Sequence, residues 1–234
     1  MFIRPQKFEA IVAKKDYLNP NTVELTLNLH NPNSIDFQSG QFVSLEVAEN
    51  EYRAYSISSE ENSHSKIRLL IEVSHSGKGA DLVKRINVEE KITFIGPSGK
   101  FTLPNELPNK IVFIATGVGF APFESMLHKL EDLKFSGVIE FFFGIRNPEN
   151  LFKEEYLKKY SDQNNLFKYY LCFSQGIGRV TKVLPSKLDL SREKNTLFLI
   201  CGNPNMIHEM NDTLIKNGIN EKNILHEKFT YAAI

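Results

Sequence analysis

The chain has 234 residues, of which 41% are hydrophobic, so it is long enough for one large domain or two of ordinary size. Lys and Arg together number 28, as do Asp and Glu, and this balance indicates neither nucleic acid nor an anionic membrane as a main partner. The only cysteines are Cys172 and Cys201, which excludes a disulfide framework and an iron–sulfur cluster held by four thiolates of this chain.

The first ten residues carry Arg4, Lys7 and Glu9 and lack the apolar core of a secretory signal. No later stretch approaches the roughly twenty apolar residues that cross a bilayer. The six histidines have no metal-binding spacing, so no metal site is expected. We therefore expect a cytoplasmic protein.

Short β-type runs fill the first part of the chain. Several alternate apolar with polar residues, as between Val23 and Leu29, and turn residues separate them. One stretch, 79–86, has helical spacing instead. The expected strands are 8–12, 22–29, 41–47, 54–58, 67–73 and 91–95. This pattern predicts an antiparallel β-barrel with one short capping helix.

Beyond Pro104 and Pro108, apolar strands alternate with amphipathic helices. Such alternation is typical of a parallel sheet that is covered on both faces. The expected strands are 111–115, 138–143, 167–173 and 197–200, and the expected helices are 121–133, 153–160 and 206–216. We therefore predict two domains, a barrel over 1–103 and an α/β domain over 104–234.

The tetrapeptide Arg53-Ala54-Tyr55-Ser56 lies on a predicted strand, where residues i and i+2 share a face. A guanidinium can pair with a pyrophosphate, an aromatic ring can cover a flavin, and a hydroxyl can hydrogen-bond to a ring nitrogen. Taken alone, an arginine next to a strand aromatic is more often surface decoration. Similarly, the glycine-rich segment 76–80 either presents free N–H groups to phosphates at a helix start or is a simple turn.

The segment Gly117-Val118-Gly119-Phe120-Ala121-Pro122 follows a hydrophobic strand and opens a helix. This context suits a dinucleotide phosphate, although the third glycine and the acidic residue of the usual Rossmann fingerprint are absent. A plain strand-to-helix turn is the alternative. Cys201-Gly202-Asn203-Pro204 ends another predicted strand, where open α/β sheets bind ligands, although a buried cysteine often only packs. Glu227 could belong to an ordinary final strand.

Six motifs, in this order, resemble those of the ferredoxin–NADP reductase superfamily, and the resemblance extends from about residue 8 to the chain end. They are Arg53-Ala54-Tyr55-Ser56, 96–101, 117–122, 144–146, 201–204 and 227–229. The resemblance implies a barrel that binds FAD and an α/β domain that binds NAD(P)H, with the reaction in the cleft between them.

The resemblance also implies roles for individual residues. Arg53 would contact the FAD pyrophosphate, Tyr55 would lie against the flavin, and Ser56 would hydrogen-bond near its N5. Cys201 would border the nicotinamide, and Glu227 would stabilise reduced flavin or relay protons. The other implied FAD contacts are Ala54, Gly79, Ala80 and Phe229. The implied NAD(P)H contacts are Thr116, Gly117, Gly119, Pro122, Arg146, Ser174, Arg179, Gly202 and Pro204.

Three positions depart from the family pattern. Ala80 stands where relatives commonly have Ser or Thr, and Val118 stands where a Thr is usual. Gln175 follows Ser174 where NADP-preferring members often have Arg, and glutamine lacks the charged fork that pairs with a 2′-phosphate. Arg179 resembles a second basic position of that pocket. Coenzyme choice is therefore open, with a lean to NADPH.

We accordingly expect an FAD-dependent NAD(P)H reductase that exchanges single electrons with a separate carrier such as ferredoxin or flavodoxin. The first alternative is an NAD(P)H:flavin reductase that releases flavin as a substrate. The second, of another class, is an interaction module that has lost redox activity on the same fold.

Overall fold

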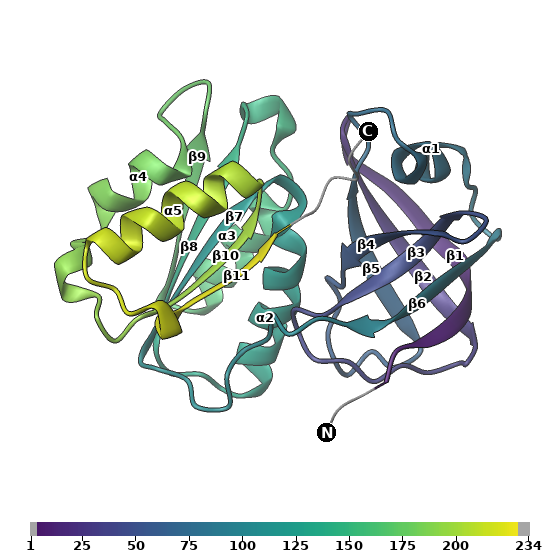
Figure 1. Cartoon of the computed structure of the whole chain (residues 1–234), viewed down its shortest axis with the longest axis horizontal. Coiled ribbons are helices and arrows are strands. Elements are labelled where there is room, and N and C mark those ends of the chain that lie inside the picture. The colour runs from purple at the N-terminus through teal and green to yellow at the C-terminus, as the bar shows by residue number, and fades with distance from the viewer. Residues whose placement is uncertain (1–3, 229–234) are drawn as a thin grey trace. The chain divides into compact units, whose positions relative to one another are not determined.

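A computed structural model describes residues 4–228, and contact clustering divides the chain into two compact units (Figure 1). The first, here called the barrel unit, comprises the chain up to Leu103 together with Ala121–Lys134. The second, the sheet unit, comprises Pro104–Phe120 and the chain from Phe135 onward. The sequence-based division between residues 103 and 104 stays a prediction, since helix 121–132 clusters with the barrel.

Six antiparallel strands form the sheet of the barrel unit, in the order β4-β3-β6-β1-β2-β5. Their bounds are β1 (Gln6–Asn19), β2 (Thr22–Asn31), β3 (Phe42–Ala48), β4 (Glu51–Ser56), β5 (Lys66–Glu72) and β6 (Lys91–Ser98). A bridge between Ile57 and Leu69 links the two edge strands, which closes the barrel. The alternating residues Val23, Leu25 and Leu27 all point into its core. The predicted antiparallel barrel is confirmed.

Two helices complete the barrel unit. The predicted capping helix is α1 (Lys78–Arg85), which lies at one end of the barrel and buries Val83 against the core (Figure 1). The other is α2 (Ala121–Asp132). β1 continues seven residues beyond its predicted end at Val12, because its hairpin with β2 stays paired as far as Asn19 and Thr22. The added residues are largely polar and follow no apolar alternation, which hid them from the sequence pattern.

The sheet unit contains five strands in the order β11-β10-β7-β8-β9, and every neighbouring pair is parallel. Their bounds are β7 (Lys110–Thr116), β8 (Val138–Ile145), β9 (Phe167–Phe173), β10 (Leu197–Gly202) and β11 (Ile224–Lys228). The chain runs from the central strand β7 outward through β8 to β9, then returns to the other side of β7 as β10. β7 and β10 therefore flank the point where the strand order reverses.

Helices cover both faces of this sheet, as the alternation predicts. The helices α4 (Val180–Lys187) and α5 (Pro204–Lys216) share one hydrophobic cluster with Val112, Phe142 and Ile200. The other face carries Phe141 and Phe143 of β8, which alternate with Phe142 along the strand. Both rings contact Phe120 of the 3-10 turn η1 (Gly117–Phe120), which also contacts Tyr156 of α3 (Glu154–Gln163). α4 is absent from the sequence prediction, because Pro185 lies inside it and proline normally interrupts a helix. Within residues 4–228, no helix combines the length and apolar character needed to cross a bilayer.

Candidate functional site

The barrel unit brings the tetrapeptide on β4 against the start of α1. A Cβ built on Gly79 would collide with the phenol oxygen of Tyr55, and it would lie 3.8 Å from Cγ of Arg53. Only a residue without a side chain allows the helix to approach the strand this closely. Three residues that the sequence assigned to one ligand, Arg53, Tyr55 and Gly79, are thus assembled.

The first turn of α1 supplies donors and positive charge. The N–H of Asp81 donates to the carbonyl of Gly77 at 2.8 Å, so the N–H groups before it have no partner inside the helix. Gly77 has open space where a Cβ would be. Lys78 forms an ion pair with Glu51, and Arg53 donates to the carbonyl of Tyr52 at 2.8 Å. Free N–H groups beside a guanidinium and an ammonium fit a pyrophosphate, so the residues present fit FAD.

The other residues of the tetrapeptide differ in exposure. Burial raises the pKa of Tyr55 to about 12, against the smaller opposing effect of Arg53, so the phenol stays protonated. Ser56 is buried opposite Phe42 of β3, whereas Ala54 is exposed. Ala80 is buried in α1, so at this place only its backbone can serve a ligand.

In the sheet unit, two predicted segments meet at the carboxyl ends of neighbouring strands. β7 ends at Thr116 and leads directly into η1, and β10 ends at Gly202. Ala115 and Cys201 are register partners in the parallel pair. Open parallel sheets bind ligands outside the carboxyl ends of strands where the order reverses, which is the position of both segments.

Thr116 joins these two segments. Its hydroxyl oxygen accepts a hydrogen bond from the backbone N–H of Asn203 at 2.8 Å. A Cβ on Gly202 would collide with that oxygen and lie 2.7 Å from the backbone oxygen of Thr116. Asn203 then caps α5 by accepting from the N–H of Asn205 at 2.9 Å, and Pro204 occupies the first helical turn, where no N–H is required.

The two glycines of the loop serve different ends. Gly117 has φ +53° and open space around a Cβ, so it provides a turn that leaves room on that side. A Cβ on Gly119 would collide with the carbonyl oxygen of Cys201 and lie 2.8 Å from Cα of Gly202. Gly119 therefore allows the two strand ends to touch. Pro122 is buried in the first turn of α2.

Cys201 and Glu227 are register partners in the parallel pair of β10 and β11. The thiol of Cys201 is fully buried, and burial, followed by the charge of Glu227, raises its pKa well above the ordinary value. Cys201 therefore stays a neutral thiol rather than a nucleophilic thiolate. Phe229, which the sequence placed near the flavin, lies outside the described residues.

The remaining predicted residues follow β8 and β9 at the same end of the sheet. The N–H of Ser174 donates to the carbonyl of Ile145 at 2.9 Å, and the N–H of Gln175 donates to that of Arg146 at 3.0 Å. Arg146 and Ser174 are exposed, and the exposed Arg179 is the N-cap residue of α4. Two guanidinium groups are therefore available at this end.

Some residues of the site escaped the sequence analysis. Lys78 and Glu51 stand out only once α1 is packed on β4. Arg179, which the resemblance did name, is placed by the unpredicted helix α4. The glycines on either side of Ile177 are the one local signal that a turn precedes this helix.

Two family models match the chain, one over most of the barrel unit and one over most of the sheet unit. Residues 9–103 match the family described as oxidoreductase FAD-binding domain, and residues 113–212 match the oxidoreductase NAD-binding domain. The chain is 26% identical over 237 residues to the reductase component of propane 2-monooxygenase from Rhodococcus jostii. This alignment covers 95% of the chain but only 63% of that longer relative.

Solved structures share the fold. The cytochrome P450 reductase GcoB of Amycolatopsis has a TM-score of 0.90 at 20% identity, covering 98% of this chain and 71% of that one. A ferredoxin NADP⁺ reductase from Neisseria gonorrhoeae, with bound FAD and NADP, has a TM-score of 0.82 at 21% identity. That match covers 98% of this chain and 100% of the other.

Proposed function

Because the chain belongs to the ferredoxin–NADP reductase superfamily, we propose that it is an FAD-dependent NAD(P)H reductase that supplies single electrons to a separate protein carrier. FAD, when bound, accepts a hydride from the nicotinamide and gives up its two electrons one at a time. The observation that carries the proposal is the convergence of Arg53, Tyr55 and Gly79 at the start of α1.

In the barrel unit, each residue has a distinct task. Arg53 and the N–H groups of the first turn of α1 bind the pyrophosphate, which brings the flavin ring to β4. Tyr55 covers a face of the ring and, with its raised pKa, keeps a neutral hydroxyl as a hydrogen-bond donor. The hydroxyl of Ser56 hydrogen-bonds near N5, the atom that receives the hydride.

In the sheet unit, the ends of β7 and β10 orient the nicotinamide dinucleotide. Thr116, Gly117, Gly119, Gly202 and Pro204 shape the backbone around its pyrophosphate, with Pro122 at the start of α2. Cys201 borders the nicotinamide as a neutral thiol, and Glu227 stabilises the reduced flavin or relays a proton. Phe229 is proposed to lie near the flavin ring.

We propose a preference for NADPH over NADH. Arg146 and Arg179 are exposed cations that follow β8 and β9, and a 2′-phosphate would pair with either guanidinium. Gln175 lacks such a charge, so these two arginines carry the preference.

The electron acceptor is proposed to be a small carrier such as ferredoxin or flavodoxin. The 234 residues contain two cysteines, too few for a cluster that needs four thiolates, and this supports an acceptor centre outside these residues. The relative from Rhodococcus jostii is named as the reductase component of a monooxygenase, which supports electron delivery to another protein. A cytoplasmic location remains a prediction that cell fractionation tests.

An anaerobic titration tests the proposal. We expect the protein to leave gel filtration yellow, and its flavin absorbance to bleach on addition of NADPH and less readily with NADH. Active but colourless protein would support a flavin reductase that releases its flavin. Absence of diaphorase activity with both coenzymes would support a redox-inactive module.

One variant examines the chemistry itself. Ser56→Ala should slow flavin reduction in stopped-flow experiments without releasing FAD, because the hydroxyl assists only at N5. Reduction at the wild-type rate would refute the role assigned to Ser56.

A further inference from the structure

Arg68, on β5, is the centre of a buried charge cluster in the barrel unit. Its guanidinium donates to Oε1 of Glu124 at 2.9 Å and lies 3.5 Å from Oε2 of Glu24 and 3.8 Å from Oε2 of Glu60. The Arg68 side chain is only 20% exposed, and that of Glu124 is 1% exposed. None of these residues belongs to the motifs that identify the flavin or dinucleotide sites.

The same arginine holds the chain that follows the flavin tetrapeptide. Its guanidinium donates to the carbonyl of Ser58 at 3.4 Å, and its backbone N–H donates to the hydroxyl of Ser59 at 3.2 Å. The N–H of Ser58 in turn donates to the carbonyl of Arg68 at 2.9 Å. Ser58 and Ser59 are both fully buried, and Ser58 lies two residues after Ser56.

Through Glu124, Arg68 also holds the first turn of α2. Glu124 lies two residues after Pro122, and η1 leads into α2 without an intervening residue. A carboxylate in the first turn is favourable for the helix dipole as well as for the arginine. One side chain therefore contacts both the segment after the proposed N5 contact and the helix start after the proposed dinucleotide loop.

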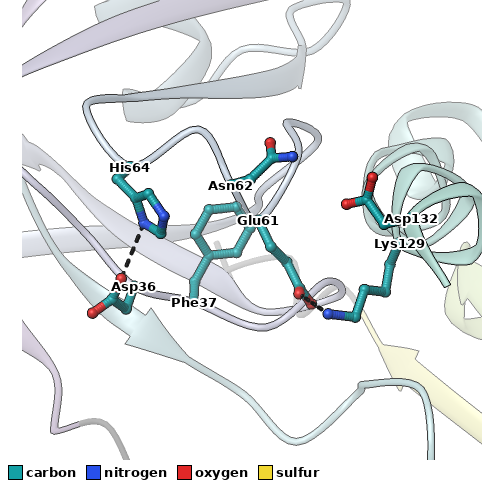
Figure 2. Close-up of a pocket in the computed structure, with 7 residues that line it drawn as sticks. All are labelled: Asp36, Phe37, Glu61, Asn62, His64, Lys129 and Asp132. Atoms are coloured by element: carbon teal, nitrogen blue, oxygen red, sulfur yellow. Dashed lines mark hydrogen bonds and ion pairs between the residues drawn. The ribbon is translucent and has the colours of Figure 1, made fainter.

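Further contacts hold α2 on the barrel in the same orientation. The hydroxyl of Ser39 donates to the carbonyl of Ser125 at 3.0 Å, and Lys129 donates to Glu61 at 2.6 Å. Figure 2 shows this second contact, with Lys129 reaching from α2 to the loop after β4. α2 thus has several contacts with the barrel, and Arg68 is the residue among them that hydrogen-bonds both to Glu124 and to the backbone carbonyl of Ser58.

A buried ion cluster is a weak way to gain stability, since apolar residues of similar size often stabilise a fold equally well. A guanidinium does, however, impose directions on its partners that apolar packing does not. We propose that Arg68 is a positioning residue for flavin reduction, which aligns the Ser56 segment and the first turn of α2 through Ser58, Ser59 and Glu124. This inference rests on the proposed reductase function.

The test replaces the pair by apolar residues. The double variant Arg68→Leu/Glu124→Leu removes the closest pair of the cluster, and the side chains of Glu24 and Glu60 that remain are 13% and 38% exposed to water, so the variant should fold. We expect its limiting rate of flavin reduction at saturating NADPH to fall by up to about a hundredfold, the cost of a misplacement of reacting groups by roughly 1 Å. Glu124→Gln, which keeps the hydrogen-bond acceptor, should retain most of the rate, and it serves as the second variant if the double variant does not fold.

Lys110→Met is the matched control. Lys110 belongs to the sheet unit, is 24% exposed, and pairs with Glu193 at 2.6 Å and Glu140 at 3.3 Å. Its loss should lower the melting temperature without changing the limiting reduction rate. Equal losses of rate in the control and in the double variant would mean that Arg68 acts only through stability, which would overturn the inference.

Hydrogen exchange of the FAD-free protein gives a readout independent of activity. In the double variant, the amides of 57–59, 121 and 123–125 should exchange faster than in the wild type, while those of β7 stay unchanged. Unaltered exchange in both segments, or an unaltered reduction rate in a folded double variant, would refute the positioning role. Wild-type protein that neither binds FAD nor reacts with NAD(P)H would instead refute the proposed function, and hydrogen exchange would still decide the structural claim.

Discussion

The candidate site of the barrel unit consists mainly of long side chains, whereas that of the sheet unit consists mainly of glycine backbone. On the barrel, long charged and aromatic side chains such as Arg53 and Tyr55 reach from a strand toward a helix start. On the sheet, the strand ends meet through residues that lack side chains, with Gly119 and Gly202 each in contact with backbone atoms. The barrel site therefore depends on the side chains that it carries, whereas the sheet site depends on glycines, whose lack of a side chain lets the strand ends approach each other.

The largest effect is expected where a side chain is added to the sheet unit. In Gly202→Ala, the new methyl group would collide with Thr116, and the backbone has a φ of +135°, which alanine rarely adopts. The free energy of unfolding should therefore fall by about 3 kcal/mol. Urea unfolding measures this change. Gly117→Ala is the control, because its Cβ finds open space and only the φ of +53° opposes it, at a cost of about 1 kcal/mol. Equal costs at both positions would contradict the view that close backbone approach explains Gly202.

The next effect concerns the barrel unit. Gly79→Ala should weaken FAD binding about tenfold, because the added methyl displaces Tyr55 from the start of α1. Adding Tyr55→Phe removes the oxygen that collides and should restore part of the lost affinity. Flavin fluorescence titration of the apoprotein measures both. A double variant that binds no better than Gly79→Ala would show that the phenol oxygen is not the source of the conflict.

Alkaline unfolding should separate the two units. In the sheet unit, burial raises the pKa of Cys172 from 9.0 to about 12, and in the barrel unit the pKa of Tyr55 rises from 10.0 to about 12. Each group loses its proton more easily when unfolded, so its contribution to stability is complete below the unfolded pKa and declines as pH rises toward the folded one.

Urea unfolding at a series of pH values tests the pH range over which each group loses its contribution to stability. Compared with wild type, Cys172→Ala should flatten the decline of unfolding free energy from pH 9 upward. Tyr55→Phe should flatten it only above pH 10. If the unfolding free energy declined with pH at the same slope in all three proteins, burial of Cys172 and Tyr55 would not be the cause of the decline.

The smallest effect is expected at the far end of α1. Lys15, on the hairpin of β1 and β2, donates to the carbonyls of Lys84 and Ile86, both at 2.9 Å. A cation at a helix C-terminus contributes about 0.5–1 kcal/mol, so Lys15→Met should cost this much stability. FAD affinity should fall less than in Gly79→Ala. Lys14→Met, on the same hairpin, is the control: the Lys14 side chain is 68% exposed and pairs with Asp16, so its loss should be nearly silent.

Local pattern in the sequence was enough for much of the architecture. Alternation along β2, the helical spacing near Val83 and the glycine loop after β7 each involve neighbours in the chain, so they predicted the barrel, its capping helix and the parallel sheet. Local pattern failed at α4, because Pro185 inside the segment argues against a helix although α4 is as long as the predicted α1.

Only the tertiary structure decided which distant residues meet. The sequence by itself placed α2 after the glycine loop and determined its helical character, but the packing assigned that helix to the barrel unit. Arg68 and Glu124 are 56 positions apart, and nothing in their local surroundings distinguishes them from a surface pair. Their pairing arises because burial requires each charge to find a partner, and that requirement is settled by the folded chain as a whole.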